Sequence, residues 1–183
     1  MSAVAPSLSF EAERPSLRGW IVMGWAAFGF VALLVDALVR LGGIAWQSVS
    51  GGEFRWWHGV SLLVWVVAMG YMEGYRGFQL RFSPRFAARA LWLAKNPTLG
   101  RSLLAPFFCM GLFQATRRVL LVSWGVLVGV VLLVIAIRQL DQPWRGIIDG
   151  GVVVGLGWGL MASVFWLVQA ARGRPLPSGP ELP

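Results

Sequence analysis

The sequence predicts an all-α integral membrane protein in which four transmembrane helices form two hairpins. A cytoplasmic amphipathic interfacial helix and a short apolar segment are expected to join the hairpins. Hydrophobic residues make up 57% of the 183 residues and charged residues only 13%, about half the charged fraction of a typical soluble domain. The apolar residues also gather in long runs, which is typical of a chain in contact with lipid.

The chain divides into five regions on this basis. They are a cytoplasmic N-terminal tail (1–19), a first transmembrane hairpin (20–78), a basic cytoplasmic or interfacial segment (79–118), a second transmembrane hairpin (119–171) and a cytoplasmic C-terminal tail (172–183). The expected spans are residues 20–39, 57–75, 119–137 and 147–171. At about 1.5 Å per residue, a run of roughly 20 residues crosses the ~30 Å hydrocarbon core. The first run is expected to remain as an uncleaved span, although Gly43 and Ala45 resemble a signal-peptide cleavage site.

The distribution of basic residues predicts the orientation. Twelve of the 16 lysines and arginines flank the spans on the side that holds both tails and the middle segment. The positive-inside rule therefore places both termini in the cytoplasm. Of all 16 basic residues, fifteen are arginine. This excess fits a GC-rich bacterial coding sequence and a bacterial inner membrane. The net charge of +8 is explained by topology and by anionic lipid, so no nucleic-acid partner is expected.

The middle segment is expected to begin with a helix over residues 84–95, because Ser83-Pro84 resembles a helix start and Asn96-Pro97 a stop. On a helical wheel one side carries the basic residues and the other carries apolar residues. This pattern favours a helix lying at the membrane surface, with its basic side chains contacting anionic lipid. The predicted contacts are Arg85, Arg89 and Lys95.

Residues 103–113 form an apolar run too short to cross a membrane. Such a run suits an interfacial helix, a re-entrant element that lines a cavity, or a segment buried between the spans. The sequence favours the interfacial helix and leaves the other two possibilities open.

Small residues recur every fourth position in the last span and predict a close-packing face. The face consists of Gly151, Gly155, Gly159 and Ser163. Gly125 and Gly129 form a shorter stripe in the third span, so packing of these two helices within one chain is expected. The alternative is that the longer stripe binds a second copy or another membrane protein.

The chain contains none of the common catalytic motifs, and no cofactor or metal site is predicted. Cys109 is the only cysteine and His58 the only histidine, so one chain offers neither a thiolate cluster nor two axial haem ligands. His58 is expected to form an interfacial hydrogen bond, with a single pigment or metal ligand as the alternative.

Acidic residues within membrane spans are candidates for function because burying charge in lipid is costly. Asp36 and Asp149, however, each have an arginine four residues away, so each is expected to form a local ion pair. The pairs are Asp36 with Arg40, and Arg145 with Asp149.

The stretch GYMEGYRGF, residues 70–78, is the best candidate for a ligand or lipid-headgroup site. It places Glu73, Arg76, Tyr71 and Tyr75 at the cytoplasmic edge of the second span, among three glycines that leave room for a ligand. The sequence nevertheless favours an ordinary helix end, in which Glu73 pairs with Arg76 three residues later and the segment packs on the amphipathic helix.

These features predict a non-enzymatic accessory or assembly subunit of a membrane complex. Its partners would be the bilayer, anionic lipids, and either another membrane protein or further copies of itself. The alternative is a small oligomeric transporter or channel in which Glu73 and Arg76 line the path. A lipid-modifying enzyme is a weaker third hypothesis, because only Glu73 or His58 would serve as a base.

Overall fold

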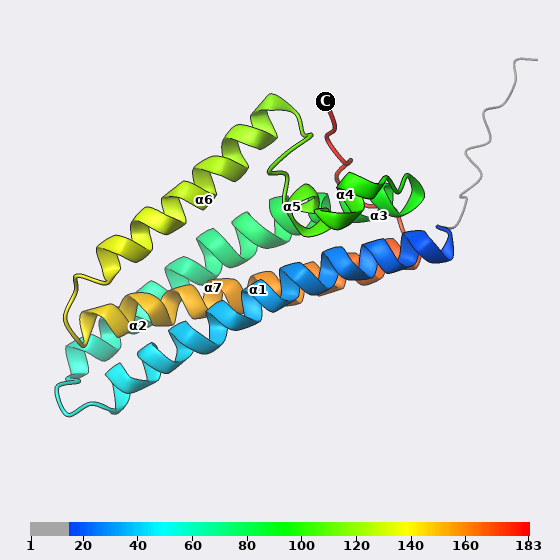
Figure 1. Ribbon diagram of the computed structural model, residues 1–183. Coiled ribbons are helices and arrows are strands. Elements are labelled where there is room, and N and C mark those ends of the chain that lie inside the picture. Colours follow the sequence, from blue (N-terminus) through cyan, green and yellow to red (C-terminus); the bar gives the residue numbers. More distant parts are fainter. Residues whose placement is uncertain (1–14) are drawn as a thin grey trace, which may run out of the picture.

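The computed structural model describes residues 15–183, and residues 1–14 of the predicted N-terminal tail lie outside this range. The described part is helical and contains no strand. Its elements are α1 (Leu17–Ser50), α2 (Trp56–Met69), η1 (Gly70–Phe82), α3 (Ser83–Lys95), α4 (Leu99–Leu103), α5 (Ala105–Cys109), α6 (Arg117–Ile137) and α7 (Trp144–Ala171) (Figure 1). Three of them, α1, α6 and α7, are long and apolar enough to span a membrane.

The second predicted span takes a different form. Helix α2 has only 14 residues, but it continues through η1, a π-helix, directly into α3. The sequence predicted a break before Pro84, with Ser83 capping a new helix; instead Ser83 keeps helical dihedral angles (φ −64°, ψ −40°), and its N–H donates to the carbonyl of Phe78, five residues back. A proline lacks the N–H of an α-helical bond, and here it occupies the first turn of α3, directly after the wider π-helical turns.

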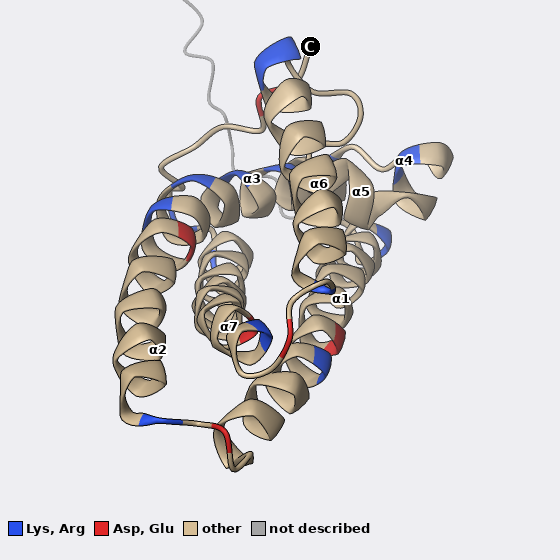
Figure 2. Cartoon of the chain, turned by 90° about the vertical axis from the view of Figure 1, so that its left-hand side faces the viewer, with Lys and Arg blue, Asp and Glu red and all other residues tan. Residues whose placement is uncertain are grey.

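Helix α7 is the centre of the arrangement. It packs along α1 on one side and along α2 and η1 on another, and α3 lies against its C-terminal half. Figure 2 shows α7 between α2 and α1, with α3 crossing one end. Helix α1, with 34 residues, is about 50 Å long. It is therefore longer than the hydrocarbon core of a bilayer, which is about 30 Å thick.

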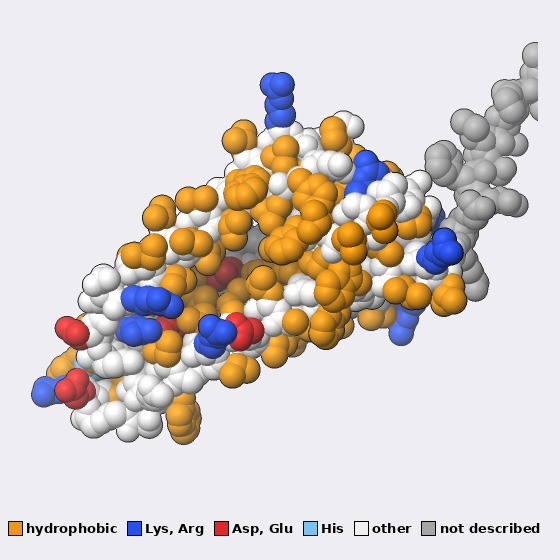
Figure 3. All heavy atoms as spheres, viewed as in Figure 1, with side chains coloured by type: hydrophobic (Ala, Val, Ile, Leu, Met, Phe, Trp, Pro, Cys, Tyr) orange, Lys and Arg blue, Asp and Glu red, His pale blue; other side chains and the backbone are white. Residues whose placement is uncertain are grey.

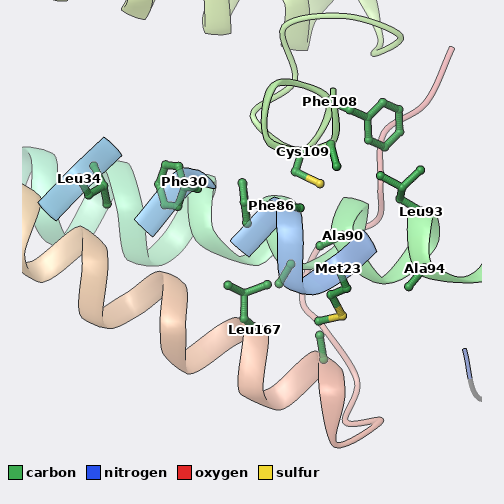
Figure 4. Packing of buried hydrophobic residues seen from close by; sticks show 14 residues of the cluster. Met23, Phe30, Leu34, Phe86, Ala90, Leu93, Ala94, Phe108, Cys109 and Leu167 are labelled. Carbon is green, nitrogen blue, oxygen red and sulfur yellow. The ribbon is translucent and has the colours of Figure 1, made fainter. Parts of the chain in front are cut away.

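The main core lies where α3 and α5 meet α1 and α7 (Figure 4). Phe86, Ala90 and Leu93 of α3 are fully buried there, against Phe30 of α1 and Leu167 of α7. The apolar face of α3, which was predicted to contact lipid, therefore packs against protein instead. A helical wheel identifies an apolar face, but it cannot distinguish burial against protein from burial against lipid.

The apolar run 103–113 forms parts of two short helices and a turn. In α5, Ala105, Phe108 and Cys109 are buried, and Pro106 lies against Gly29 of α1. The segment thus packs on the protein with one side, and Phe107 on its other side is 48% exposed. Of the three arrangements considered from the sequence, it most resembles a segment buried against the spans.

Helix α6 stands apart from the other long helices along most of its length (Figures 1 and 2). It contacts the rest of the protein mainly near its two ends. Near its start Ser123 Oγ donates to the carbonyl of Met110 (3.0 Å), and at its end Ile137 is buried. No atom lies within 4 Å of a Cβ built on Gly125 or Gly129. The predicted packing of this span on α7 through its glycines is therefore absent.

Candidate functional site

The stretch singled out from the sequence lies on η1, the 13-residue π-helix. In most proteins a π-helical segment is a single turn, and it is frequently found at a functional site. The wider turn changes which side chains share a face, because its hydrogen bonds join residues five apart instead of four. This change decides how the predicted cluster is arranged.

Glu73 is half-buried and packs against α7. A Cβ built on Gly155 would lie 2.6 Å from Glu73 Oε2, so the glycine leaves the space that this carboxylate occupies. Glu73 Oε2 is buried and has no hydrogen-bond partner among the described residues. An acid in this state within an apolar bundle is costly unless it finds a partner.

Glu73 and Arg76 do not form the predicted ion pair. The ion pairs in residues 15–183 involve Asp36, Asp149 and Glu181, and Arg76 is exposed without one. The prediction assumed α-helical spacing, in which residues three apart share a face. In the wider π-helix that spacing no longer applies.

Tyr71 and Tyr75 stack on each other with ring centroids 6.0 Å apart. They line an apolar groove of about 400 Å³ on the surface of α2, η1 and α7. The rest of its lining is Val66, Val67, Gly70, Val154 and Trp158. Glu73 is absent from this lining, so the structure separates the tyrosines from the carboxylate that the sequence grouped with them.

The small-residue face of α7 is filled by side chains of the same molecule. A Cβ on Gly151 would lie 2.2 Å from Trp65, and one on Gly159 would lie 2.5 Å from the ring of Phe78. Ser163 completes the face with a hydrogen bond to Ser83 (2.9 Å between the hydroxyl oxygens). The face is thus used within the chain, as expected, but its neighbour is α2–η1–α3 instead of α6.

Two tryptophan contacts that the sequence did not indicate fasten η1 to α7. Trp158 Nε1 donates to Gln79 Oε1 at 2.7 Å, and Trp166 Nε1 donates to the backbone oxygen of Gln79 at 3.2 Å. No spacing rule relates residues some 80 positions apart. In the sequence Gln79 is one of several polar residues near the end of the second span, and nothing there distinguishes it from Arg76 or Arg81.

Arg89 lies inside the protein and is therefore not positioned to contact lipid. Its side chain is fully buried, and its guanidinium donates to four backbone carbonyls while resting on the ring of Phe108, 4.2 Å from the centroid. The accepting carbonyls belong to Phe108 (2.7 Å), Pro180 (2.9 Å), Phe113 (3.1 Å) and Gln114 (3.0 Å). Burial lowers the pKa of Arg89 to about 10, so the group still carries its charge at neutral pH.

The other two predicted lipid contacts differ from each other. Arg85 is largely covered and lies 3.8 Å from Glu181, and burial lowers its pKa. Lys95 is exposed at the end of α3. The alanines around Arg89, at positions 87, 88 and 90, are the signal in the sequence for its burial, because small residues allow neighbouring backbones to approach closely.

Both predicted i,i+4 acid–base pairs bring their partners together, with unequal geometry. Arg40 Nε donates to Asp36 Oδ1 at 3.0 Å on the exposed side of α1. Arg145 and Asp149 are 3.9 Å apart, and Arg145 Nε has no hydrogen-bond partner.

His58 caps the start of α2. The N–H of Arg55 donates to His58 Nδ1 at 3.0 Å, and the imidazole meets the ring of Trp144 edge-on. No group of three or more His, Cys, Asp or Glu side chains in residues 15–183 is arranged to hold a metal ion.

A hollow lies beneath α6, because that helix stands apart from α7 and α2. Figure 3 shows it as a depression with an acidic side chain at its bottom and charged side chains near one end. The site thus has two features that the contacts within residues 15–183 do not complete: the open side of α6 and the unpartnered carboxylate of Glu73.

The chain matches no protein-family model, no curated protein and no solved structure.

Proposed function

We propose that this protein is a non-enzymatic accessory or assembly subunit of a membrane complex, and that α6 is the helix that binds its partner. The observation that carries this proposal is the isolation of α6. Within the apolar 18-residue stretch of α6, only 6% is buried inside the protein. The corresponding shares are 22% for α1 and 33% for α7.

The glycines of α6 support the same proposal. In lipid, helices associate chiefly through close packing, and a Gly-xxx-Gly pair allows two backbones to approach. Gly125 and Gly129 form such a pair with open space around both. The longer stripe on α7 already contacts Trp65, Glu73 and Phe78 of the same chain. The glycine pair of α6 is therefore the surface proposed to bind a helix of the partner.

The experiment that tests this proposal introduces large side chains on α6 and compares their effect on partner binding with that of a large side chain on another open helix surface. Gly125→Leu combined with Gly129→Leu should leave the protein folded and abundant, because neither site has a neighbour. A stoichiometric partner that co-purifies with the wild type in nanodiscs from the native host should be lost. Gly42→Leu on α1, which also has open space, is the control and should retain the partner. Equal recovery of the partner with the α6 variant, or no stoichiometric partner with the wild type, would reject the proposal.

The proposed topology has four spans, with α2 and the first part of η1 forming the fourth. Both termini lie in the cytoplasm of a bacterium, and the spans cross its inner membrane. Cysteine labelling tests this arrangement, because the native Cys109 is buried. A membrane-impermeant maleimide should label the Gly52→Cys variant in intact spheroplasts. It should label the Ser178→Cys variant only after permeabilisation; the reverse pattern would invert the topology.

A small oligomeric transporter or channel is the second candidate, favoured by the unpartnered carboxylate of Glu73. It predicts that proteoliposomes conduct protons or small cations and that Glu73→Gln stops this flux without lowering the amount of folded protein. Glu53→Gln, in the exposed turn after α1, is the matched control. Wild-type vesicles as tight as protein-free vesicles would exclude this function.

A further inference from the structure

Helix η1 carries two opposite charges that the protein does not pair. Glu73 and Arg76 are three residues apart, and neither takes part in an ion pair within residues 15–183. Glu73 Oε2 also lacks a hydrogen-bond donor. A helix that carries one unmatched acid and one unmatched base three residues apart, on different faces, is complementary to a zwitterion long enough to bridge them.

The surroundings place this pair at the level of lipid headgroups. Helix α2 ends at Met69 after an almost uninterrupted apolar run, and η1 begins at once with polar and aromatic residues. Tyr71 and Tyr75 lie two residues before and after Glu73 in the sequence, and tyrosine is enriched where the hydrocarbon core meets the headgroups.

The two charged groups are also accessible to different degrees. Arg76 is exposed, whereas Glu73 is half-buried between η1 and α7. A group on a flexible linker can therefore reach inward to a carboxylate while its other charge stays at the surface.

We propose that Glu73 and Arg76 bind the headgroup of an aminophospholipid of the phosphatidylethanolamine type. The ammonium group donates hydrogen bonds to the Glu73 carboxylate, and the phosphate accepts them from the Arg76 guanidinium. Charge-assisted hydrogen bonds of both kinds are strong in a partly desolvated site. A choline headgroup has no N–H to donate. A glycerol headgroup donates only from neutral hydroxyls and carries no positive charge, so it leaves the charge of Glu73 uncompensated.

The experiment measures which lipid stays with the protein. Wild-type protein is equilibrated in mixed micelles containing equal amounts of phosphatidylethanolamine, phosphatidylcholine and phosphatidylglycerol, then purified, and its retained lipids are quantified by mass spectrometry. We expect phosphatidylethanolamine to exceed phosphatidylcholine roughly tenfold, the fold-change for a charge-assisted hydrogen bond. Glu73→Gln should return this ratio to that of the mixture, and Glu53→Gln should leave the enrichment intact.

Arg76→Gln separates the two halves of the site. It should lower the retention of both zwitterionic lipids while their ratio stays high, because the phosphate contact is common to both. A ratio near one with wild-type protein, or an unchanged ratio in Glu73→Gln, would overturn the proposal.

A series of lipids gives the same test without a variant. Stepwise N-methylation of phosphatidylethanolamine removes its N–H donors, and retention by wild-type protein should fall at each step. Retention that is indifferent to methylation would equally contradict the proposal, even if a variant at Glu73 failed to fold.

Discussion

Arg89 shows how one charged residue can hold together one end of a helical protein. Its guanidinium binds carbonyls from α5, from the turn before α6 and from the C-terminal tail. No carboxylate within residues 15–183 forms an ion pair with it, so oriented backbone dipoles compensate its charge. Arginine suits this role because its planar fork presents five donors in fixed directions, whereas lysine presents three on a single atom.

Arg89→Lys should therefore destabilise the protein. One ammonium group cannot reach carbonyls on three separate segments, so buried acceptors would lose their donors. The expected loss is about 3 kcal/mol in the free energy of unfolding, measured by thermal or denaturant unfolding in detergent. Lys95→Ala at the exposed end of the same helix should change it by less than about 0.5 kcal/mol. Equal effects of the two substitutions would show that the buried network contributes little.

Cys109 provides a probe of the same region. Its side chain is 1% exposed, and burial raises the pKa of its thiol to about 12, an effect that the nearby charge of Arg89 partly opposes. The thiolate is the reactive form, so the folded protein should resist maleimide at pH 7 and also at pH 9. The unfolded protein, with an ordinary thiol pKa near 9, should react faster as the pH rises. Rapid labelling of the folded protein would place Cys109 at the surface.

At the scale of elements, η1 packs closely on α7 because glycines of α7 leave room for its side chains. Two glycines of α7, one inside this contact and one outside it, allow a test. Gly159 faces the ring of Phe78, whereas a Cβ on Gly157 has no atom within 4 Å. Gly159→Ala should destabilise the protein by about 1–3 kcal/mol through overpacking. Gly157→Ala should be neutral or slightly stabilising, because alanine favours a helix more than glycine does. Comparison of their unfolding free energies checks the contact, and a loss in Gly157→Ala equal to that in Gly159→Ala would contradict it.

The apolar runs predicted α1, α6 and α7 because hydropathy reports directly on contact with lipid or with a core. The hydrophobic pattern gave wrong neighbours where the prediction depended on which surface, protein or lipid, covers a helix. The wheel of α3 was amphipathic in the expected way, yet its apolar side and Arg89 are both inside the protein. The glycines of α6 matched those of α7 in spacing, yet side chains from α2 and η1 occupy the α7 stripe.

The candidate site was predictable in part, for a related reason. Its position at the end of an apolar run and the chemistry of Glu73 could be recognised from the sequence. Its internal arrangement could not, because the π-helical register of η1 moves Arg76 away from pairing with Glu73 and places the tyrosines on a separate groove. The hydrogen bonds from Trp158 and Trp166 to Gln79 arise only from the packing of distant segments.

At the scale of the whole molecule, the C-terminal tail completes the fold. Leu176 and Leu182 pack against the main core, and the backbone oxygen of Glu181 accepts a hydrogen bond from the N–H of Thr116 at 3.1 Å. The carbonyl of Pro180 is one of the four acceptors around Arg89. The tail therefore connects the start of α6 to α3, two segments that have few other contacts.

Removal of residues 175–183 should open this end of the bundle. Arg89 would lose one acceptor, Thr116 would lose its partner, and the apolar surface under Leu176 and Leu182 would be exposed. We expect a lower melting temperature and rapid maleimide labelling of Cys109 without denaturant. Glu181→Gln removes only the 3.8 Å ion pair with Arg85 and keeps every backbone contact, so it should change the free energy of unfolding by less than about 1 kcal/mol. If the truncated protein protects Cys109 as fully as the wild type, the tail is an appendage, and α3, α5 and α6 hold this end together without it.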